Sequence, residues 1–327
     1  MRPRVIPILA TVTKPRHRGV PLAFLLLIGL AGDAATQTPQ PYRISVNVDL
    51  VVLHPTVRDA KGKFASDLGE PDFAVYEDGV RQSIRLFQHE DIPVTVGLVV
   101  DHSGSMRRKL ADVVAAARTF VQSSRPDDQM FVVNFNEKVT LGLSGAVSFT
   151  NRSEDLERAV SGTPAAGMTA LYDAVAKGQE RLQAGSRDKK VLIVISDGGD
   201  NASAHTLAGV LKIAERSSAL VYTIGIFDEE DSARNPDVLR RLAMVTGGQA
   251  FFPRQLNEVV AICEDIARDI RHQYTIGYVS SNAATAGVYR AVRVVARAQG
   301  KSKLVVRTRS GYIAGGDSRS VQEEIPK

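Results

Sequence analysis

Two stretches of the chain, residues 94–100 and 191–195, are almost continuously hydrophobic. Runs of this kind are typical of strands that are buried on both faces of a parallel sheet. In the segments between and after them, hydrophobic residues recur with the spacing of a helix face. The pattern predicts helices at Arg107–Gln122, Leu156–Val160, Thr169–Leu182, Thr206–Ser217, Pro236–Val245 and Glu258–Arg271, and further strands at Met130–Phe135, Lys138–Leu143, Leu220–Ile226 and Gln249–Phe252. This order predicts an α/β fold over residues 92–272, with a doubly wound, mostly parallel sheet flanked by helices.

Residues 42–91 and 273–314 instead show the alternation of antiparallel strands. Residues 42–53 alternate with a change of phase that indicates a bulge or bend. Asp78-Gly79 lies between two alternating runs, a strong hairpin signal. Further strands are predicted at Gln273–Val279, Tyr289–Ala298 and Leu304–Thr308. Because neither segment is long enough to bury a core alone, we expect the two to pair into one small antiparallel β-sandwich.

The first 34 residues have the features of an export signal. A basic stretch that ends at Arg18 precedes an apolar run at residues 20–31, which is short for a membrane span, and small residues follow it. We expect a signal peptide at residues 1–34, a linker at 35–41, and a periplasmic, cell-surface or secreted protein. An uncleaved signal anchor is the alternative, and it would be the protein's one attachment to a membrane. At the other end, residues 315–327 are expected to form a disordered tail.

Net charge and cysteine content narrow the function classes. The formal charge is +5, but residues 1–34 hold five basic side chains against one acidic one, so the rest of the chain has a net charge of +1. That near-neutral balance gives no electrostatic reason to expect nucleic-acid binding. The single cysteine, Cys263, excludes an intrachain disulfide and lies on the apolar side of a predicted helix, which favours a buried, inert thiol.

Carboxylate and hydroxyl side chains gather where predicted strands end or helices begin. Asp101, Ser103 and Ser105 follow the strand at 94–100, Thr169 precedes a helix, and Asp197 follows the strand at 191–195. In a doubly wound sheet, these positions meet at the edge where ligands bind. Five hard oxygen donors suit Mg²⁺, which prefers octahedral coordination and keeps some of its waters, so a position remains for an outside ligand.

Taken together, these residues resemble the metal-ion-dependent adhesion site of the von Willebrand factor type A domain, with every motif in the family's order over residues 92–272. The resemblance implies a bound Mg²⁺ or Mn²⁺ ion. Ser103, Ser105 and Thr169 would contact the ion directly or nearly so, whereas Asp101 and Asp197 would often act through water. In the family, an acidic group of a protein partner frequently completes the coordination sphere. The segments at 73–79 and 273–278 are also similar to exported proteins of the acidobacterial type that carry this domain.

Other interpretations of the same residues remain open. Asp and Ser after a strand are also good helix caps, and Thr163 is a second hydroxyl that the glycine-rich loop could bring to the site. The favoured function is a non-enzymatic, exported binding or adhesion module that engages a protein partner through the ion. One alternative is an accessory subunit of an envelope assembly with a structural ion. A metal-assisted hydrolase is the other, although the sequence offers no general base for it.

Overall fold

The structure is a computed structural model that describes residues 47–143, 148–227, 234–282, 286–301, 303–315 and 319–322. The chain divides into two units, Met1–Ile44 and Ser45–Lys327, and everything described here belongs to the second. The predicted signal peptide and linker lie outside the described residues, as do residues 42–46 of the predicted N-terminal strand.

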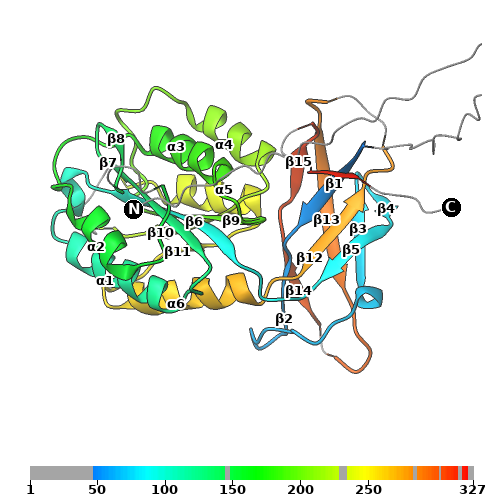
Figure 1. Cartoon of the computed structure of the whole chain (residues 1–327). Helices are drawn as coiled ribbons and strands as arrows, with labels where there is room; N and C mark the ends of the chain where they lie inside the picture. The colour runs from blue at the N-terminus through cyan, green and yellow to red at the C-terminus, as the bar shows by residue number, and fades with distance from the viewer. Residues whose placement is uncertain are drawn as a thin grey trace, which may run out of the picture. The chain divides into compact units, whose positions relative to one another are not determined.

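A six-stranded sheet forms the centre of the α/β region, with the strand order β11-β10-β9-β6-β7-β8 (Figure 1). Its strands are β6 (Val94–Asp101), β7 (Gln129–Phe135), β8 (Val139–Leu141), β9 (Lys189–Ser196), β10 (Leu220–Gly225) and β11 (Ala250–Phe251). Every pairing is parallel except that of β8 with β7. All eight residues of β6 are buried, because the strand lies in the middle of the sheet with helices on both faces.

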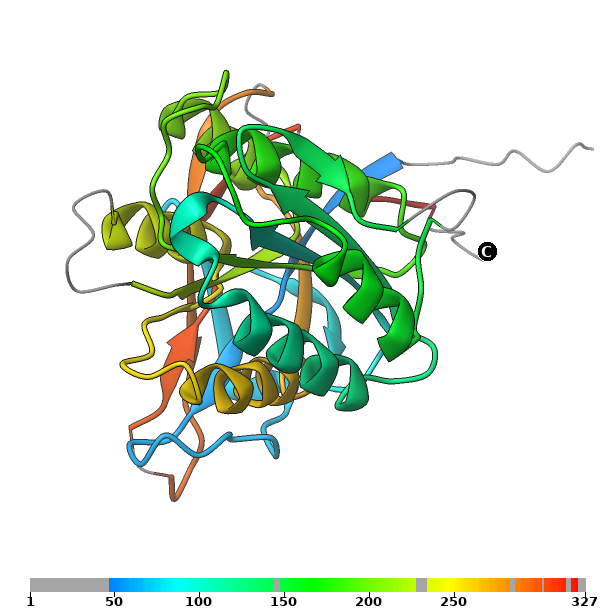
Figure 2. The same cartoon turned by 90° about the vertical axis from the view of Figure 1, so that its left-hand side faces the viewer.

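Six helices cover the two faces of this sheet (Figure 2). They are α1 (Leu110–Gln122), α2 (Ser153–Ser161), α3 (Leu171–Gln183), α4 (Leu207–Arg216), α5 (Pro236–Thr246) and α6 (Glu258–Arg271). Helices α1, α2 and α6 pack on one face, whereas α3, α4 and α5 pack on the other. The predicted α/β fold is therefore confirmed, and Cys263 is buried in the first of these two cores. Among the described helices, none has both the length and the apolar composition that a membrane crossing requires.

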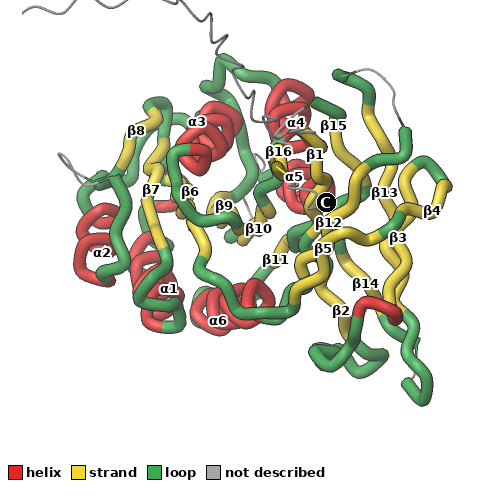
Figure 3. Tube along the Cα trace, turned by 45° about the vertical axis from the view of Figure 1, so that its right-hand side comes forward, coloured by secondary structure: helices red, strands yellow, loops and turns green. Residues whose placement is uncertain are grey.

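Strands from the two ends of the described chain interleave in the β region (Figure 3). The sheet orders are β16-β1-β12-β5, β15-β13-β3-β4 and β14-β2. The strands are β1 (Asn47–Leu53), β2 (Thr56–Arg58), β3 (Phe73–Glu77), β4 (Val80–Gln82), β5 (Ile84–Gln88), β12 (Thr275–Val279), β13 (Tyr289–Ala296), β14 (Val305–Arg307), β15 (Gly311–Ile313) and β16 (Arg319–Gln322). Residues of both segments share one hydrophobic core, so the predicted pairing into an antiparallel structure is confirmed.

Two local expectations differ from the structure. The Asp78-Gly79 turn joins β3 to β4, whereas the alternating run at Ile84 and Leu86 was expected to form the second strand of the hairpin. That later run forms β5, which pairs with β12 in the other sheet. The chain passes from one sheet to the other after Gln82, whose side-chain amide is hydrogen-bonded to Ser281. As a result, Ile84 and Phe87 pack against the shared hydrophobic core.

The expectation of a disordered tail at residues 315–327 is wrong for part of that range. Residues Arg319–Gln322 form β16, which pairs antiparallel with β1 along Asn47–Leu50. The edge of β1 is therefore closed by a strand from the far end of the chain. At the bend expected near residue 53, β1 ends at Leu53, and β2 begins at Thr56 in a different sheet.

Arginines from the β region donate to the C-terminal ends of two helices. Arg309, which is 8% exposed, donates to the carbonyl oxygens of Glu215 and Ser217 at the end of α4. Arg307 donates to the carbonyl oxygen of Gly247 at the end of α5, and it pairs with the buried carboxylate of Asp269 in α6. Cations are favourable at helix C-termini, where the unpaired carbonyl groups concentrate negative charge.

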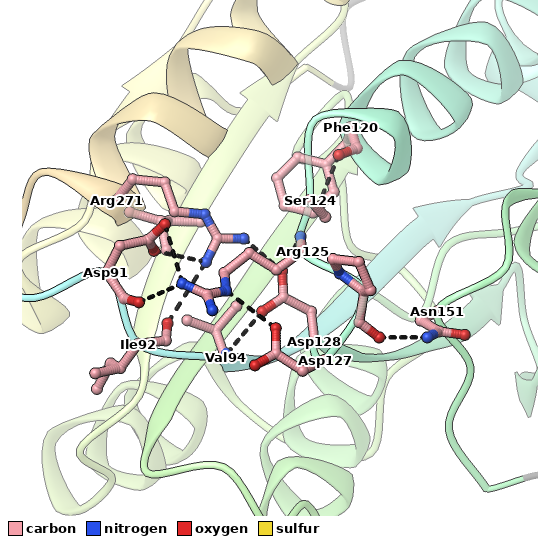
Figure 4. A network of polar contacts seen from close by, with 12 residues as sticks. Asp91, Ile92, Val94, Phe120, Ser124, Arg125, Asp127, Asp128, Asn151 and Arg271 are labelled. Carbon is pink, nitrogen blue, oxygen red and sulfur yellow. Dashed lines mark hydrogen bonds and ion pairs between the residues drawn. The ribbon is translucent and has the colours of Figure 1, made fainter.

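A second polar network ties together the two chain connections between the regions (Figure 4). Arg271, at the end of α6, pairs with Asp91 at 3.1 Å and also with Asp128. The side chain of Asp128 is fully buried and accepts further hydrogen bonds from the backbone N–H groups of Val94 and Arg125. Asp91 lies just before β6 and Arg271 just before β12, so this cluster fixes where the chain enters and leaves the α/β region.

We predict that Arg271→Met lowers the free energy of unfolding by about 2 kcal/mol, because it leaves the buried Asp128 carboxylate with backbone partners only. Arg268→Met is the matched control, since Arg268 is 60% exposed and its ion pair is with the exposed Asp265; we expect a change of about 0.5 kcal/mol or less. Urea unfolding measures both. Equal losses in the two variants would show that the cluster does not stabilise this junction.

Candidate metal centre

Asp101 is the last residue of β6 and is fully buried. One carboxylate oxygen accepts from the backbone N–H of Ser103 at 2.8 Å, and the other accepts from the hydroxyl of Ser196 at 2.6 Å. Burial raises the pKa of the Asp101 carboxyl to about 6, although both hydrogen bonds oppose that shift. The nearby carboxylate of Asp197 raises the pKa further. A cation at this edge would favour the ionised form of both carboxyls.

Ser103 and Ser105 place two hydroxyls at the same point. The chain leaves β6 through a short 3-10 helix (Gly104–Met106), and its first turn brings the two Oγ atoms within 3.1 Å of each other. The Ser105 hydroxyl donates to Oδ2 of Asp197 at 2.5 Å. These two side chains are 92 residues apart in the sequence, yet they touch because β6 and β9 are neighbouring parallel strands. The structure therefore joins two of the predicted motifs directly.

The backbone around Asp197 is held in a conformation that suits glycine. Gly198 has a φ of +79°, and a Cβ atom there would lie 2.4 Å from the carbonyl oxygen of Asn235. The backbone N–H of Asn235 donates in turn to the carbonyl of Asp197 at 3.1 Å, and the N–H of Gly199 donates to the Asp197 carboxylate at 3.1 Å. This close approach between the two backbone segments fixes the position of Asp197 just after the end of β9.

Thr169 reaches the same edge through backbone hydrogen bonds. Its N–H donates to Oδ1 of Asn201 at 2.8 Å, and its carbonyl accepts from the N–H groups of Asn201 and Ala202. The loop before it is attached to the Ser103–Ser105 turn, because the N–H of Gly104 donates to the carbonyl of Gly167 at 3.2 Å. Among the described residues, the Thr169 hydroxyl makes no hydrogen bond with the four other predicted ligands. Thr169 is therefore brought to the site, but not into direct contact with them.

Thr163, the alternative hydroxyl, has a different partner. Its oxygen accepts from the side-chain amide of Asn134 at 3.2 Å, and the same amide donates to the carbonyl of Ala159. Asn134 also binds the ring of His102, which is fully buried, at 3.1 Å. These contacts direct the Thr163 hydroxyl toward β7 and α2 and so favour Thr169 as the ligand.

Ser196 and Asn201 belong to the site as well, although they are not among the five predicted ligands. Ser196 supports the buried carboxylate of Asp101, and Asn201 positions Thr169. Asp200 accepts from the N–H of Tyr172 and so caps the first turn of α3. All three belong to the run at 196–201, whose density of short polar side chains after an apolar strand is the signal that could have identified them.

The donors at this edge fit a hard divalent cation. They are carboxylate and hydroxyl oxygens, without sulfur or imidazole, which are the ligands that Mg²⁺ and Mn²⁺ take in proteins. Among the described residues, no group of three or more His, Cys, Asp and Glu side chains is placed to hold a metal ion. A site here would therefore depend on hydroxyl oxygens as well as on the two carboxylates.

Comparison with protein families decides the identity of this region. The model of the von Willebrand factor type A domain matches residues 95–265, which is more than half of the chain. The chain belongs to the von Willebrand factor type A domain family. The match includes all five predicted ligands, and it spans most of the six-stranded sheet and of the helices that cover it. No curated protein matches the chain.

Solved structures of similar fold come from several organisms. A von Willebrand factor type A protein from Catenulispora acidiphila is 13% identical, with a TM-score of 0.49, covering 84% of this chain and 75% of that one. Proximal thread matrix protein 1 from the mussel byssus, with a zinc-occupied MIDAS motif, is 15% identical, with a TM-score of 0.49 and coverages of 60% and 50%. The type V pilus tip protein Mfa5 from Porphyromonas gingivalis is 14% identical, with a TM-score of 0.47 and coverages of 55% and 95%.

We predict that Gly198→Ala destabilises the protein by more than 2 kcal/mol, because the new methyl group meets a backbone carbonyl that cannot rotate away. Gly62→Ala is the control, since Gly62 has a φ of +80° but nothing within 4 Å of its added Cβ. It should cost only the strain of that conformation, about 1 kcal/mol. Thermal unfolding compares the two. A Gly198→Ala loss no larger than the control would mean that the Asn235 contact does not hold the Asp197 loop.

Proposed function

We propose that this protein is an exported, non-enzymatic binding module that engages an acidic group of a protein partner through a divalent cation. The ion, Mg²⁺ or Mn²⁺, would be held by the five oxygen-bearing side chains at the carboxyl edge of the sheet, namely Asp101, Ser103, Ser105, Thr169 and Asp197. The predicted signal peptide supports export, and the domain family supports a binding role.

The contact between the Ser105 hydroxyl and the Asp197 carboxylate carries the proposal. It brings donors from the two motifs to one point, so a single cation there could contact side chains of both loops. The Ser103 hydroxyl, 3.1 Å from that of Ser105, extends the same cluster.

The two carboxylates would have different roles. Both oxygens of Asp101 are already engaged, by Ser103 and Ser196, so its main contributions would be negative charge and the fixed geometry of the turn. Asp197 also has both oxygens engaged, but one of its partners is the Ser105 hydroxyl, which is itself a predicted ligand, and the other is the backbone N–H of Gly199. When bound, the cation would supply an electrophilic centre for an anionic oxygen of the partner.

The surroundings of His102 favour binding over hydrolysis. A hydrolase would need a general base near Ser103 or Ser105. His102 is the histidine nearest to them in sequence, but it is fully buried and its Nε2 atom binds the Asn134 side chain. Burial also lowers the pKa of the His102 ring, consistent with a neutral side chain in the interior.

We predict that Mg²⁺ raises the melting temperature of the protein and that EDTA reverses the effect, because an ion bound only to the folded state stabilises it. The gain is about 2.7 kcal/mol when free Mg²⁺ is about 100 times the dissociation constant. Ser105→Ala and Thr169→Ala should each abolish the shift, whereas Thr163→Ala should keep it, since its hydroxyl is bound to Asn134. Differential scanning fluorimetry with and without Mg²⁺ measures all four proteins.

This set of variants separates the possible outcomes. A wild-type protein that melts at the same temperature in Mg²⁺ and in EDTA would contradict the site. A shift that survives Thr169→Ala but disappears in Thr163→Ala would instead assign the fifth ligand to Thr163.

We also predict that an envelope protein of the native organism is retained on the immobilised protein in Mg²⁺ and released by EDTA. Ser105→Ala should lose this retention, and Asp237→Asn, which alters an exposed carboxylate on α5, should keep it. Affinity capture followed by mass spectrometry provides the measurement. Retention that is equal in EDTA and in Mg²⁺ would exclude a partner that depends on the cation.

A further inference from the structure

Helices α3 and α4 lie side by side on one face of the sheet (Figure 1), and a groove runs between them. Its volume is about 760 Å³, within the range of small-molecule sites in proteins. The five predicted ion ligands do not line this groove, so it is separate from the site at the carboxyl edge of the sheet. A hollow between two helices does not by itself indicate a ligand. The indication comes from Gln179, the most deeply buried side chain of the lining.

Gln179 is 2% exposed, and its amide has no partner among the described residues. Both amide atoms, Oε1 and Nε2, are closed off from water and make no hydrogen bond there. Leaving a buried amide unpaired destabilises the folded state, and buried polar groups in proteins are nearly always hydrogen-bonded. By contrast Gln183, one turn further along the same groove, is exposed, and its Oε1 accepts from Nζ of Lys190 at 3.1 Å. The missing partner is therefore particular to Gln179.

The Gln179 amide can turn toward the groove at little cost. Its terminal torsion is soft, and the rotatable bonds before it allow several orientations. Since the amide makes no hydrogen bond within the described part of the chain, none is broken when it turns. Ala176, one turn earlier on α3, lines the groove with a single methyl group, and Ile213 of α4 offers apolar surface on the other wall. A molecule in the groove would supply the missing donor and acceptor.

The geometry of the amide determines what would pair with it. The N–H and the carbonyl of the Gln179 side chain lie on the same edge, so a partner with both groups side by side forms two hydrogen bonds at once. Primary carboxamides, lactams and cyclic imides have such an edge. The trans peptide bond does not, since its N–H and C=O point in opposite directions. The groove therefore fits a small amide better than a stretch of polypeptide.

The charged residues of the lining favour a neutral molecule. Asp173 and Glu180 balance Lys177 and Arg216, so the acidic and basic side chains cancel. Two pairs of opposite charge are also in direct contact, His205 with Asp173 at 2.7 Å and Lys177 with Glu180 at 2.9 Å. An ionic ligand would gain little from this balance.

We propose that this groove binds a small neutral molecule through an amide edge and that Gln179 recognises it. The ligand is a primary carboxamide, a lactam or a cyclic imide, held by two hydrogen bonds at the floor of the groove and by apolar contact with Ile213. Its binding is independent of the divalent cation, because no predicted ion ligand lines the groove.

Titration of the purified protein with small amides, followed by NMR, tests this proposal. The probes are benzamide, 2-piperidone and uracil, one for each class of amide edge, and each is compared with its N-methylated counterpart, which lacks the N–H donor. We expect at least one parent compound to bind about tenfold more tightly than its counterpart, because methylation breaks the paired hydrogen bonds. Gln179→Met should remove this difference. Gln183→Met is the matched control and should keep it, since Gln183 is exposed and bound to Lys190.

Melting temperatures show whether a loss of binding is specific. Methionine has nearly the volume of glutamine and leaves no unpaired amide, so Gln179→Met should melt at the same temperature as the wild type or at a higher one. A lower melting temperature would show that the Gln179 amide already has a partner in the folded protein, which would overturn the proposal. Failure of all three compounds to bind, equal binding of the methylated forms, or unchanged binding by Gln179→Met would overturn it as well.

Discussion

The site is organised by a carboxylate that the fold buries completely. Asp101 ends the central strand of the sheet, where it is fully buried, and an ionised carboxyl there requires partners. Its two hydrogen bonds come from the turn that follows β6 and from the last residue of β9. The same charge therefore shapes the Ser103–Ser105 turn and joins it to the neighbouring strand, which places the Ser105 hydroxyl on Asp197. A divalent cation would complete this arrangement by balancing the charge of two adjacent carboxylates.

Much of this site could be predicted from the sequence because its parts lie at the ends of regular elements. Asp101, Ser103 and Ser105 are local to one turn, and Asp197 follows a second buried strand, so the parallel order of the sheet is enough to bring them together. The choice between Thr163 and Thr169 could not be made in this way. It depends on the side-chain amide of Asn134, a contact between residues whose sequence pattern gives no sign of it. Ser196 belongs to a polar run that the sequence shows, but only the structure shows that its hydroxyl reaches the Asp101 carboxylate.

The β region shows a similar limit. Alternation in the sequence indicated strands at both ends and their need to share a core, and the structure confirms that pairing. The alternation did not indicate which strand pairs with which, because a hairpin signal predicts the turn but not the length of the strand that follows it. The chain leaves β4 after Gln82, whose amide is satisfied by Ser281 from the distant C-terminal segment. Contacts of this kind, between residues about 200 positions apart, are determined by the assembled fold and not by a local pattern.

A crystal grown in Mn²⁺ would test the central claim most directly, because the anomalous scattering of manganese identifies the ion without reference to its ligands. The account predicts one strong anomalous peak at the carboxyl edge of the sheet, with the hydroxyl oxygens of Ser103 and Ser105 about 2.1 Å from it, close to the distance for Mg²⁺. A map with no peak at this edge, or with its only peak elsewhere on the chain, would contradict the account.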